Sequence, residues 1–268
     1  MGSNMLMLKL LVAFLACALV FHFLEKSKDG STPALWARSN FLTDLTYWFV
    51  TPLATTLMLE LTISGSLTVA ILVIGENITG SISFSAGLLD GKPLGVQIII
   101  GLMLGDGLYY AMHRLFHCRW LWNFHAVHHS SRAVNWLSAV RLHPVNNYLM
   151  RLSQAVLALL LGVDPQVLAV VVAFLYLYAV FIHADLDWDY GMFRYIFVSP
   201  VYHRWHHTQE EAGLDKNYSG LFPFWDILFG SCYLPKDQKP RNFGTRSPVP
   251  ETFLPQMLYP FVPKRYPG

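Results

Sequence analysis

Ten of the chain's eleven histidines lie between residues 113 and 207, and most are grouped at spacings of three or four residues. The groups are His113-x3-His117, His125-x2-His128-His129 and His203-x2-His206-His207, and His143 and His183 stand alone. A buried imidazole needs a partner for both ring nitrogens, so packing alone gives no reason to collect so many. Residues three or four apart share a helix face, which lets each group hold one side of a metal ion. The sequence therefore predicts a fold that brings distant segments together around two ions.

The composition indicates a membrane protein. Hydrophobic residues make up 54% of the chain and charged residues only 13%, against about 25% charged in soluble domains. The net charge of +2, with no basic run interleaved with aromatics, argues against a nucleic-acid partner. Cys17, Cys118 and Cys232 are isolated and form no CxxC motif, which disfavours a disulfide framework and a thiolate zinc site. We expect an integral membrane protein whose site faces a reducing compartment.

Four apolar regions approach or exceed the roughly 20 residues that a membrane span needs. They are residues 5–24, read as a retained transmembrane helix, residues 47–74, residues from 94 into the first histidine group, and residues 147–182. The last region is interrupted by Gly162 and Pro165, which predict the end of one helix and the start of the next. The predicted fold is all-α, with about four transmembrane helices in two hairpins.

The predicted topology places the histidine groups on one side of the membrane. A hairpin at about 147–182 returns the chain to the side it left, so residues 113–129 and 183–207 are expected to share one face. Basic residues on either side of the hairpin predict that this face is cytoplasmic. These residues are Arg114, Arg119, Arg132, Arg141, Arg151, Arg194, Arg204, Lys216, Lys236, Lys239 and Arg241. We therefore expect a cytosolic, histidine-rich helical cap that holds a dimetal site, in a bacterial inner membrane or in the endoplasmic reticulum of a eukaryote.

The kind of ligand limits the chemistry. Imidazole suits zinc, iron, copper and nickel, and affinity alone does not choose among them. The residues between His113 and His117 lack the glutamate of a His-Glu-x-x-His zinc peptidase, so hydrolysis is disfavoured. A nearly all-histidine site at a membrane favours two irons that reduce dioxygen to attack an unactivated C–H bond. A metal-binding or transport protein is the alternative of another class, but it predicts ligands spread through the depth of the bilayer.

The histidines occur within longer motifs. These are Asp106-x2-Tyr109-Tyr110-x2-His113-Arg114-x2-His117, Leu121-Trp122-Asn123-Phe124-His125-x2-His128-His129-Ser130, Pro200-x2-His203-Arg204-Trp205-His206-His207, Asp215-Lys216-Asn217-Tyr218 and Gly220-Leu221-Phe222-Pro223-Phe224-Trp225-Asp226-x2-Phe229-Gly230. Over roughly residues 100–235 the chain resembles the fatty acid hydroxylase / sterol desaturase superfamily, and motifs of this length in this order are very specific.

The resemblance implies an integral membrane oxygenase with two iron ions, whose place zinc can take in purified protein, and with dioxygen as co-substrate. It implies hydroxylation or desaturation of a membrane lipid, fatty acyl, sterol or related, with electrons from a separate cytochrome b5, ferredoxin or reductase-type protein. The implied ligands are His113, His117, His125, His128, His129, His183, His203, His206 and His207. We expect an N-terminal transmembrane region at 1–94, a catalytic region at 95–235 and an irregular C-terminal extension at 236–268.

Residues outside the main groups receive weaker assignments. His143 is either a tenth ligand or a donor to another ligand, and the sequence does not decide. Asp106 lies seven residues before His113, on the same helix face, and is expected to orient a ligand imidazole. His22 is expected to be structural or interfacial. Asn217 and Asp226 are candidates for holding the cap together.

Overall fold

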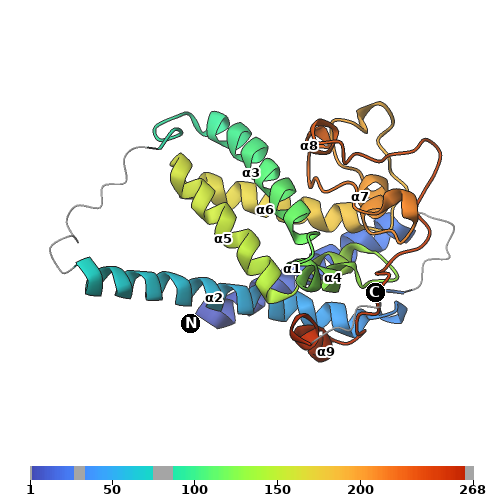
Figure 1. Cartoon of the computed structure of the whole chain (residues 1–268), viewed down its shortest axis with the longest axis horizontal. Helices are drawn as coiled ribbons and strands as arrows, with labels where there is room; N and C mark the ends of the chain where they lie inside the picture. The colour runs from blue at the N-terminus through green and yellow to red at the C-terminus, as the bar shows by residue number, and fades with distance from the viewer. Residues whose placement is uncertain (1, 27–33, 75–86, 263–268) are drawn as a thin grey trace.

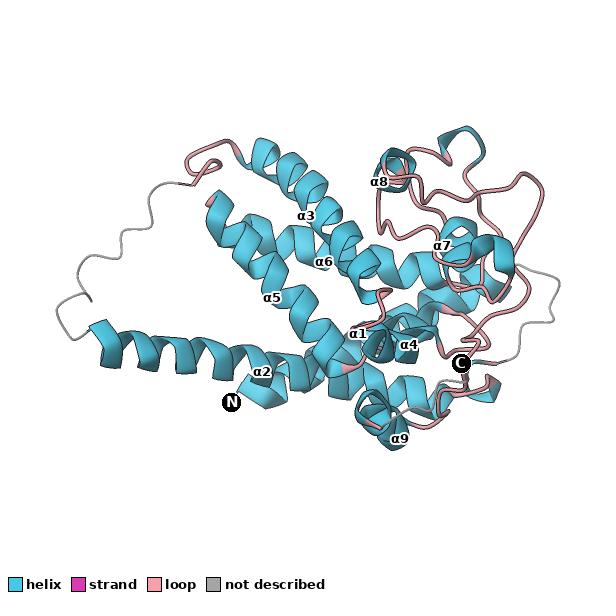
Figure 2. Cartoon of the chain, viewed as in Figure 1, coloured by secondary structure: helices cyan, strands magenta, loops and turns pink. Residues whose placement is uncertain are grey.

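The computed structural model describes residues 2–26, 34–74 and 87–262, with the side chains of 2–4 and 65–74 left out. Helices and loops make up this part of the chain (Figures 1 and 2), and its only β-type pairing is an isolated bridge between Thr208 and Phe243. The helical class predicted from the sequence is confirmed for the described residues.

The α-helices are α1 (Gly2–Lys26), α2 (Phe41–Ile74), α3 (Leu94–Phe116), α4 (Trp122–His129), α5 (Pro144–Leu161), α6 (Pro165–His183), α7 (Pro200–His206), α8 (Phe224–Leu228) and α9 (Phe253–Leu258). Short 3-10 helices are η1 (Leu35–Ala37), η3 (Trp136–Val140), η4 (Gly191–Phe193), η5 (Glu211–Gly213) and η6 (Tyr259–Phe261). Helices α3, α5 and α6 lie side by side and lead to the end of the molecule that holds α4 and α7 (Figure 1).

Three helices of the described chain are long and apolar enough to cross a membrane. They cover Met5–Glu25, Leu94–Phe116 and Pro165–His183. Along α1, Leu8, Leu15 and Leu19 are more than half exposed, as expected for side chains that face lipid. Helix α2, which covers the region 47–74 that was also expected to span the membrane, is not among these three helices, and neither is α5.

The predicted hairpin at 147–182 is present as α5 and α6. Gly162 ends α5 with φ of 67°, a left-handed conformation that glycine adopts without strain. A Cβ at this position would also lie 2.9 Å from the Cα of Gly87, so the close approach of that segment requires glycine. The Asp164 side chain accepts a hydrogen bond from the amide of Gln166 and caps α6, which begins at Pro165.

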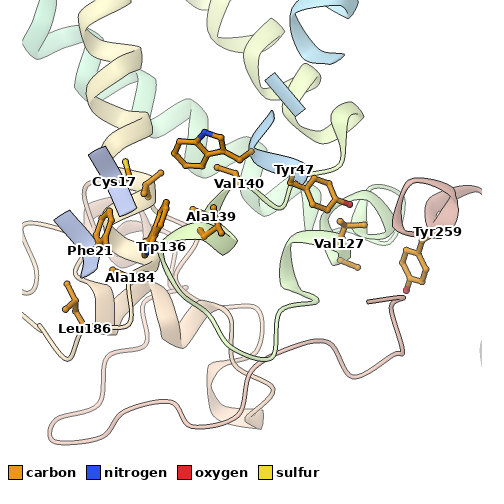
Figure 3. Close-up of a cluster of buried hydrophobic side chains, with 14 residues drawn as sticks. Cys17, Phe21, Tyr47, Val127, Trp136, Ala139, Val140, Ala184, Leu186 and Tyr259 are labelled. Atoms are coloured by element: carbon orange, nitrogen blue, oxygen red, sulfur yellow. The ribbon is translucent and has the colours of Figure 1, made fainter. Parts of the chain in front are cut away.

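The largest apolar cluster lies where α1, α2, α6 and η3 meet. Trp136 on η3 is buried at its centre, stacked on Phe21 of α1 at 5.4 Å between ring centres (Figure 3). The Trp48 ring of α2 meets Trp136 edge-on at 5.8 Å. At the start of η3, Asn135 and Ser138 form a capping box. This packing fixes the segment that joins α4 to α5.

The C-terminal extension is more regular than the sequence predicted. It includes α9, which packs against α2. The side chain of Gln256 on α9 is fully buried, and its amide nitrogen donates to the Ser130 hydroxyl and to the Pro250 carbonyl. Residues 253–258 therefore brace the end of α4 rather than forming a loose cover.

Candidate metal centre

Four helices end at the site. The α3 helix is followed by His117, α4 ends at His129, α6 ends at His183, and α7 is followed by His207. The C-terminus of a helix carries partial negative charge from its unpaired carbonyls. Because these ends gather at the histidines, the backbone itself favours a cation there.

The nine histidines predicted as ligands form two groups. The five-histidine group contains His113, His117, His125, His129 and His206, and the four-histidine group contains His128, His183, His203 and His207. Within each group the candidate ligand atoms all lie within 4.8 Å of one another. The structure thus brings together segments that are as far as 94 residues apart in sequence, from 113 to 207.

Six of the nine rings donate their Nδ1–H to an oxygen atom. The acceptors and N–O distances are the Tyr218 carbonyl for His113 (2.7 Å), Asp215 Oδ1 for His117 (3.0 Å), Asn146 Oδ1 for His125 (2.9 Å), the Arg141 carbonyl for His128 (3.3 Å), the Ala179 carbonyl for His183 (2.6 Å) and the Lys216 carbonyl for His206 (2.7 Å). A proton on Nδ1 leaves the Nε2 lone pair free, which is how metal-binding histidines are oriented.

The Nε2 atoms of these rings face one another. His113 Nε2 lies 3.0 Å from His125 Nε2, and His128 Nε2 lies 3.1 Å from His183 Nε2. Two lone pairs cannot hydrogen-bond to each other, whereas a shared cation satisfies both. In addition, Nε2 of His117 and of His206 is buried and has no hydrogen-bond partner among the residues that the structure describes. The donor set therefore fits two metal ions.

Burial keeps the ligand imidazoles neutral. It is the main cause that lowers the pKa of each cap histidine well below the usual value, and neighbouring imidazoles lower it further. The residues concerned are His117, His125, His128, His129, His203, His206 and His207. Neutral rings are the form that binds a metal.

The structure places His143 outside both groups. Its Nδ1 accepts a hydrogen bond from the amide of Val145, and its Nε2 donates to the Met257 carbonyl. Because both nitrogens are used on the backbone, neither role considered from the sequence fits. His143 caps the first turn of α5 and ties it to α9. His22, expected to be structural or interfacial, is exposed beside Phe23 on α1.

Asp106 is buried on α3, but the imidazole contact predicted for it is not what the structure has. Its two carboxylate oxygens accept hydrogen bonds from the amides of Leu221 (2.7 Å) and Phe222 (2.9 Å). These residues follow Tyr218, whose carbonyl orients His113. Asp106 therefore acts on the site through the 218–222 segment.

Asp226 holds the other end of the same segment. Its fully buried carboxylate accepts from the amides of Tyr218 (2.9 Å) and Ser219 (2.7 Å) and from the hydroxyls of Tyr202 (3.0 Å) and Ser231 (2.7 Å). Through Tyr202 it links the segment to α7, which carries His203 and His206 and is followed by His207.

Asn217 supplies a further link within the cap. Its amide nitrogen donates to the carbonyls of Tyr202 and Tyr233, and its amide oxygen accepts from the Tyr233 backbone. The sequence-based role proposed for Asn217 and Asp226, holding the cap together, agrees with these contacts.

Arg141 was counted as a loop charge in the sequence but is fully buried. Its Nε donates to Asp44 Oδ1 at 2.6 Å, which joins the site to α2, and its carbonyl accepts from His128.

Asn146, which orients His125, was not singled out by the sequence, although its place near the start of α5, three residues after His143, was a usable signal. Asp185 pairs with Arg204 at 2.7 Å.

A cavity of about 100 Å³ lies beside the histidines and is also lined by residues of α3, α5 and α6. Its wall at one end includes His113, His125, His128 and His183, and most of the remainder is apolar. A second, smaller pocket of about 40 Å³ lies between α3, α5 and α6 and shares Gln154 and Leu175 with the first. We call them the site cavity and the tail pocket. Together they lead from the histidines toward the apolar parts of α3, α5 and α6.

Comparison with known proteins relates the chain to lipid hydroxylases and monooxygenases. The sequence profile described as fatty acid hydroxylase matches residues 98–231, half of the chain. The chain is 32% identical to an ornithine lipid hydroxylase of Rhizobium tropici over 65% of this chain and 53% of that protein. It is 35% identical to an alkylglycerol monooxygenase of Danio rerio, over 59% of this chain and 35% of that protein.

A third relative is a methylsterol monooxygenase of Arabidopsis thaliana, 26% identical over 52% of this chain and 53% of that protein. The chain therefore spans about half, or less, of the length of these relatives. No solved structure matches the chain.

Proposed function

Because the chain belongs to the fatty acid hydroxylase family, we propose that it is a membrane-bound oxygenase that hydroxylates a C–H bond of a lipid with dioxygen and electrons from a separate donor protein. The observation that carries this proposal is the convergence of nine imidazoles, eight of them on buried residues, four of which line one end of a cavity with largely apolar walls. A transport protein would need ligands along a path through the bilayer, and here they gather at one level.

We assign one ion to the five-histidine group and one to the four-histidine group, and we take both ions to be iron. Bound iron would supply the reduction of dioxygen and the oxidising power to remove hydrogen from an unactivated carbon. The protein's contribution is to fix the ligands. The Tyr218 and Lys216 carbonyls and the Asn146 amide set the ring tautomers and hold the rings in place.

The apolar walls have their own role in the reaction. Val140, Met150 and Val180 line the site cavity next to the histidines and exclude water from it. A lipid methylene group can enter a cavity with such walls at little cost, because it has no hydrogen bonds to water to give up. The cavity would therefore admit the substrate and keep solvent away from the place where bound iron would supply its oxidising power.

The topology that we propose has about four membrane-spanning helices and a cytosolic cap formed by residues that follow α3 and α6. The basic residues of the cap support a cytoplasmic location by the positive-inside tendency. A cap on this side would meet a soluble or membrane-bound electron donor of the cytochrome b5, ferredoxin or reductase type. The names of the relatives, which refer to ornithine lipids, alkylglycerols and methylsterols, support a lipid as the substrate.

The test is an assay of the purified full chain, loaded with iron, with a reductant and a panel of lipids. We expect a product that gains one oxygen atom, measured by mass spectrometry, and no product under nitrogen. Chelation should abolish activity, and iron should restore it where zinc does not. Product formation without dioxygen would contradict the proposal, and a product that has lost two hydrogens would identify a desaturase instead.

A further inference from the structure

One positive charge lies inside the site cavity. Arg151 projects from α5 into the same space as His113 and His125. Its Nη1 donates to Gln154 Oε1 at 3.3 Å, and its guanidinium carbon lies 5.9 Å from the centre of the Tyr176 ring. In the described part of the chain it forms no ion pair with a carboxylate, although a charged group at membrane depth normally has a partner.

Two hydroxyls accompany this charge. Tyr109 on α3 and Tyr176 on α6 also line the site cavity. Among the described residues neither phenol oxygen has a hydrogen-bond partner, and neither is sealed off from the cavity. Helices α3, α5 and α6 thus each contribute one group that can donate a further hydrogen bond.

We propose that Arg151, together with the Tyr109 and Tyr176 hydroxyls, binds an anionic oxygen group of the lipid substrate, a carboxylate or a phosphate ester. This inference rests on the proposed function. A guanidinium is always charged and pairs with both oxyanions through parallel N–H bonds. An oxyanion would supply the counter-charge that the described protein residues do not provide and would use the two free hydroxyls.

The order of the polar side chains along α5 indicates which part of the lipid would be oxidised. Asn146 contacts the ligand His125, Arg151 comes five residues later, about 7.5 Å of helix rise, and Gln154 marks the entrance of the tail pocket. An apolar chain fits the tail pocket, whose wall is apolar apart from Gln154. The part of the lipid that reaches the histidines is then the part next to the anionic group, not the far end of its acyl chain.

The experiment measures equilibrium binding of three radiolabelled lipids with the same palmitoyl chain. They are N-palmitoyl glycine, which carries a carboxylate, palmitoyl lysophosphatidylglycerol, which carries a phosphodiester, and monopalmitoylglycerol, which is neutral. The full chain, loaded with iron, is held in detergent without dioxygen so that no turnover occurs. Because binding is measured directly, failure of the proposed reaction leaves this test intact.

We expect wild-type protein to bind at least one anionic lipid about tenfold tighter than the neutral one, which is about 1.4 kcal/mol. Arg151→Met should abolish that preference while neutral-lipid binding stays the same, and Arg151→Lys should retain part of it. The matched control is Arg132→Gln, which removes an exposed arginine outside the cavity. It should keep the full preference. The preferred anionic lipid identifies the carboxylate or the phosphodiester as the natural group.

Two results would overturn the inference. One is wild-type protein that binds all three lipids equally, and the other is Arg151→Met weakening all three to the same extent. If Arg151→Met fails to fold, the double variant Tyr109→Phe/Tyr176→Phe replaces it, since it removes only the two hydroxyls. An unchanged preference in that folded variant, together with an unchanged preference in Arg151→Lys, would also refute the role of this cluster.

Discussion

The buried ion pair between Asp44 and Arg141 gives a sharp test of how the cap is attached to the membrane helices. Arg141 is fully buried, Asp44 is 1% exposed, and the Nε–Oδ1 distance is 2.6 Å. The change Asp44→Asn keeps the shape of the side chain but leaves a buried guanidinium without a counter-charge. Breaking such a pair from one side costs about 3–5 kcal/mol, and the amide oxygen can still accept one bond, so we expect about 3 kcal/mol.

The assay is thermal unfolding of the metal-loaded protein in detergent, followed by circular dichroism. A loss of about 3 kcal/mol in a protein of this size corresponds to a fall in Tm of about 6–12 °C. The backbone carbonyl of Arg141 also accepts a hydrogen bond from His128 and orients its ring. A shift of Arg141 should therefore reduce the amount of bound metal as well. The control is Glu211→Gln, which breaks an exposed ion pair with Arg246 and should leave Tm nearly unchanged.

A double variant, Asp44→Leu/Arg141→Met, separates the ion pair from other effects. Because it removes both charges, it should be less destabilised than the sum of the two single variants. A Tm for Asp44→Asn within 1 °C of wild type, or strictly additive losses, would refute the reasoning.

Three further predictions concern the site and its walls. His143→Ala should destabilise the protein but retain both ions, whereas His125→Ala should lose metal, and metal analysis of the purified variants distinguishes the two. Asp226→Asn should cost about 2–4 kcal/mol in unfolding free energy, since a charge-assisted hydrogen bond is worth about 1.5–3 kcal/mol, and should weaken metal affinity; wild-type behaviour in both would contradict the role given to it. Gly105→Leu should fill the tail pocket and reduce turnover of long-chain lipids more than short ones, while Gly105→Ala, whose Cβ would lie 3.9 Å from Leu175, should be tolerated.

Local patterns in the sequence were enough for the hairpin, but not for the way the histidines divide. His125 and His129 lie in one group and His128 in the other, and His206 is separated from His203 and His207 in the same way. Gly162 and Pro165 end one helix and begin the next through local preferences, since glycine adopts the left-handed conformation without strain and the fixed φ of proline suits the first helical position. The histidines spaced by four residues do stay together, because residues four apart share a helix face; these pairs are His113 and His117, His125 and His129, and His203 and His207. These features can be predicted without knowing what packs against each helix.

Partners that come from distant segments were not predictable in this way. Asp106 does share a helix face with His113, but it accepts from amides more than 110 residues later, and no periodicity reports such a contact. A histidine before a proline, as at His143, can be a ligand or a helix cap, and only the position of α9 decides. Arg141 and Arg151 looked like charges of a cytosolic loop because sequence does not record burial.

The facing lone pairs of the histidines have a consequence for assembly of the protein. With no cation between them, the ends of α3, α4, α6 and α7 repel one another, and the hydrogen bonds from their Nδ1 atoms must hold the rings against that repulsion. Each ion would then link separate helix ends, and its binding free energy would stabilise the closed cap. Removal of the metal should therefore open the cap, and limited proteolysis with and without a chelator would measure that opening.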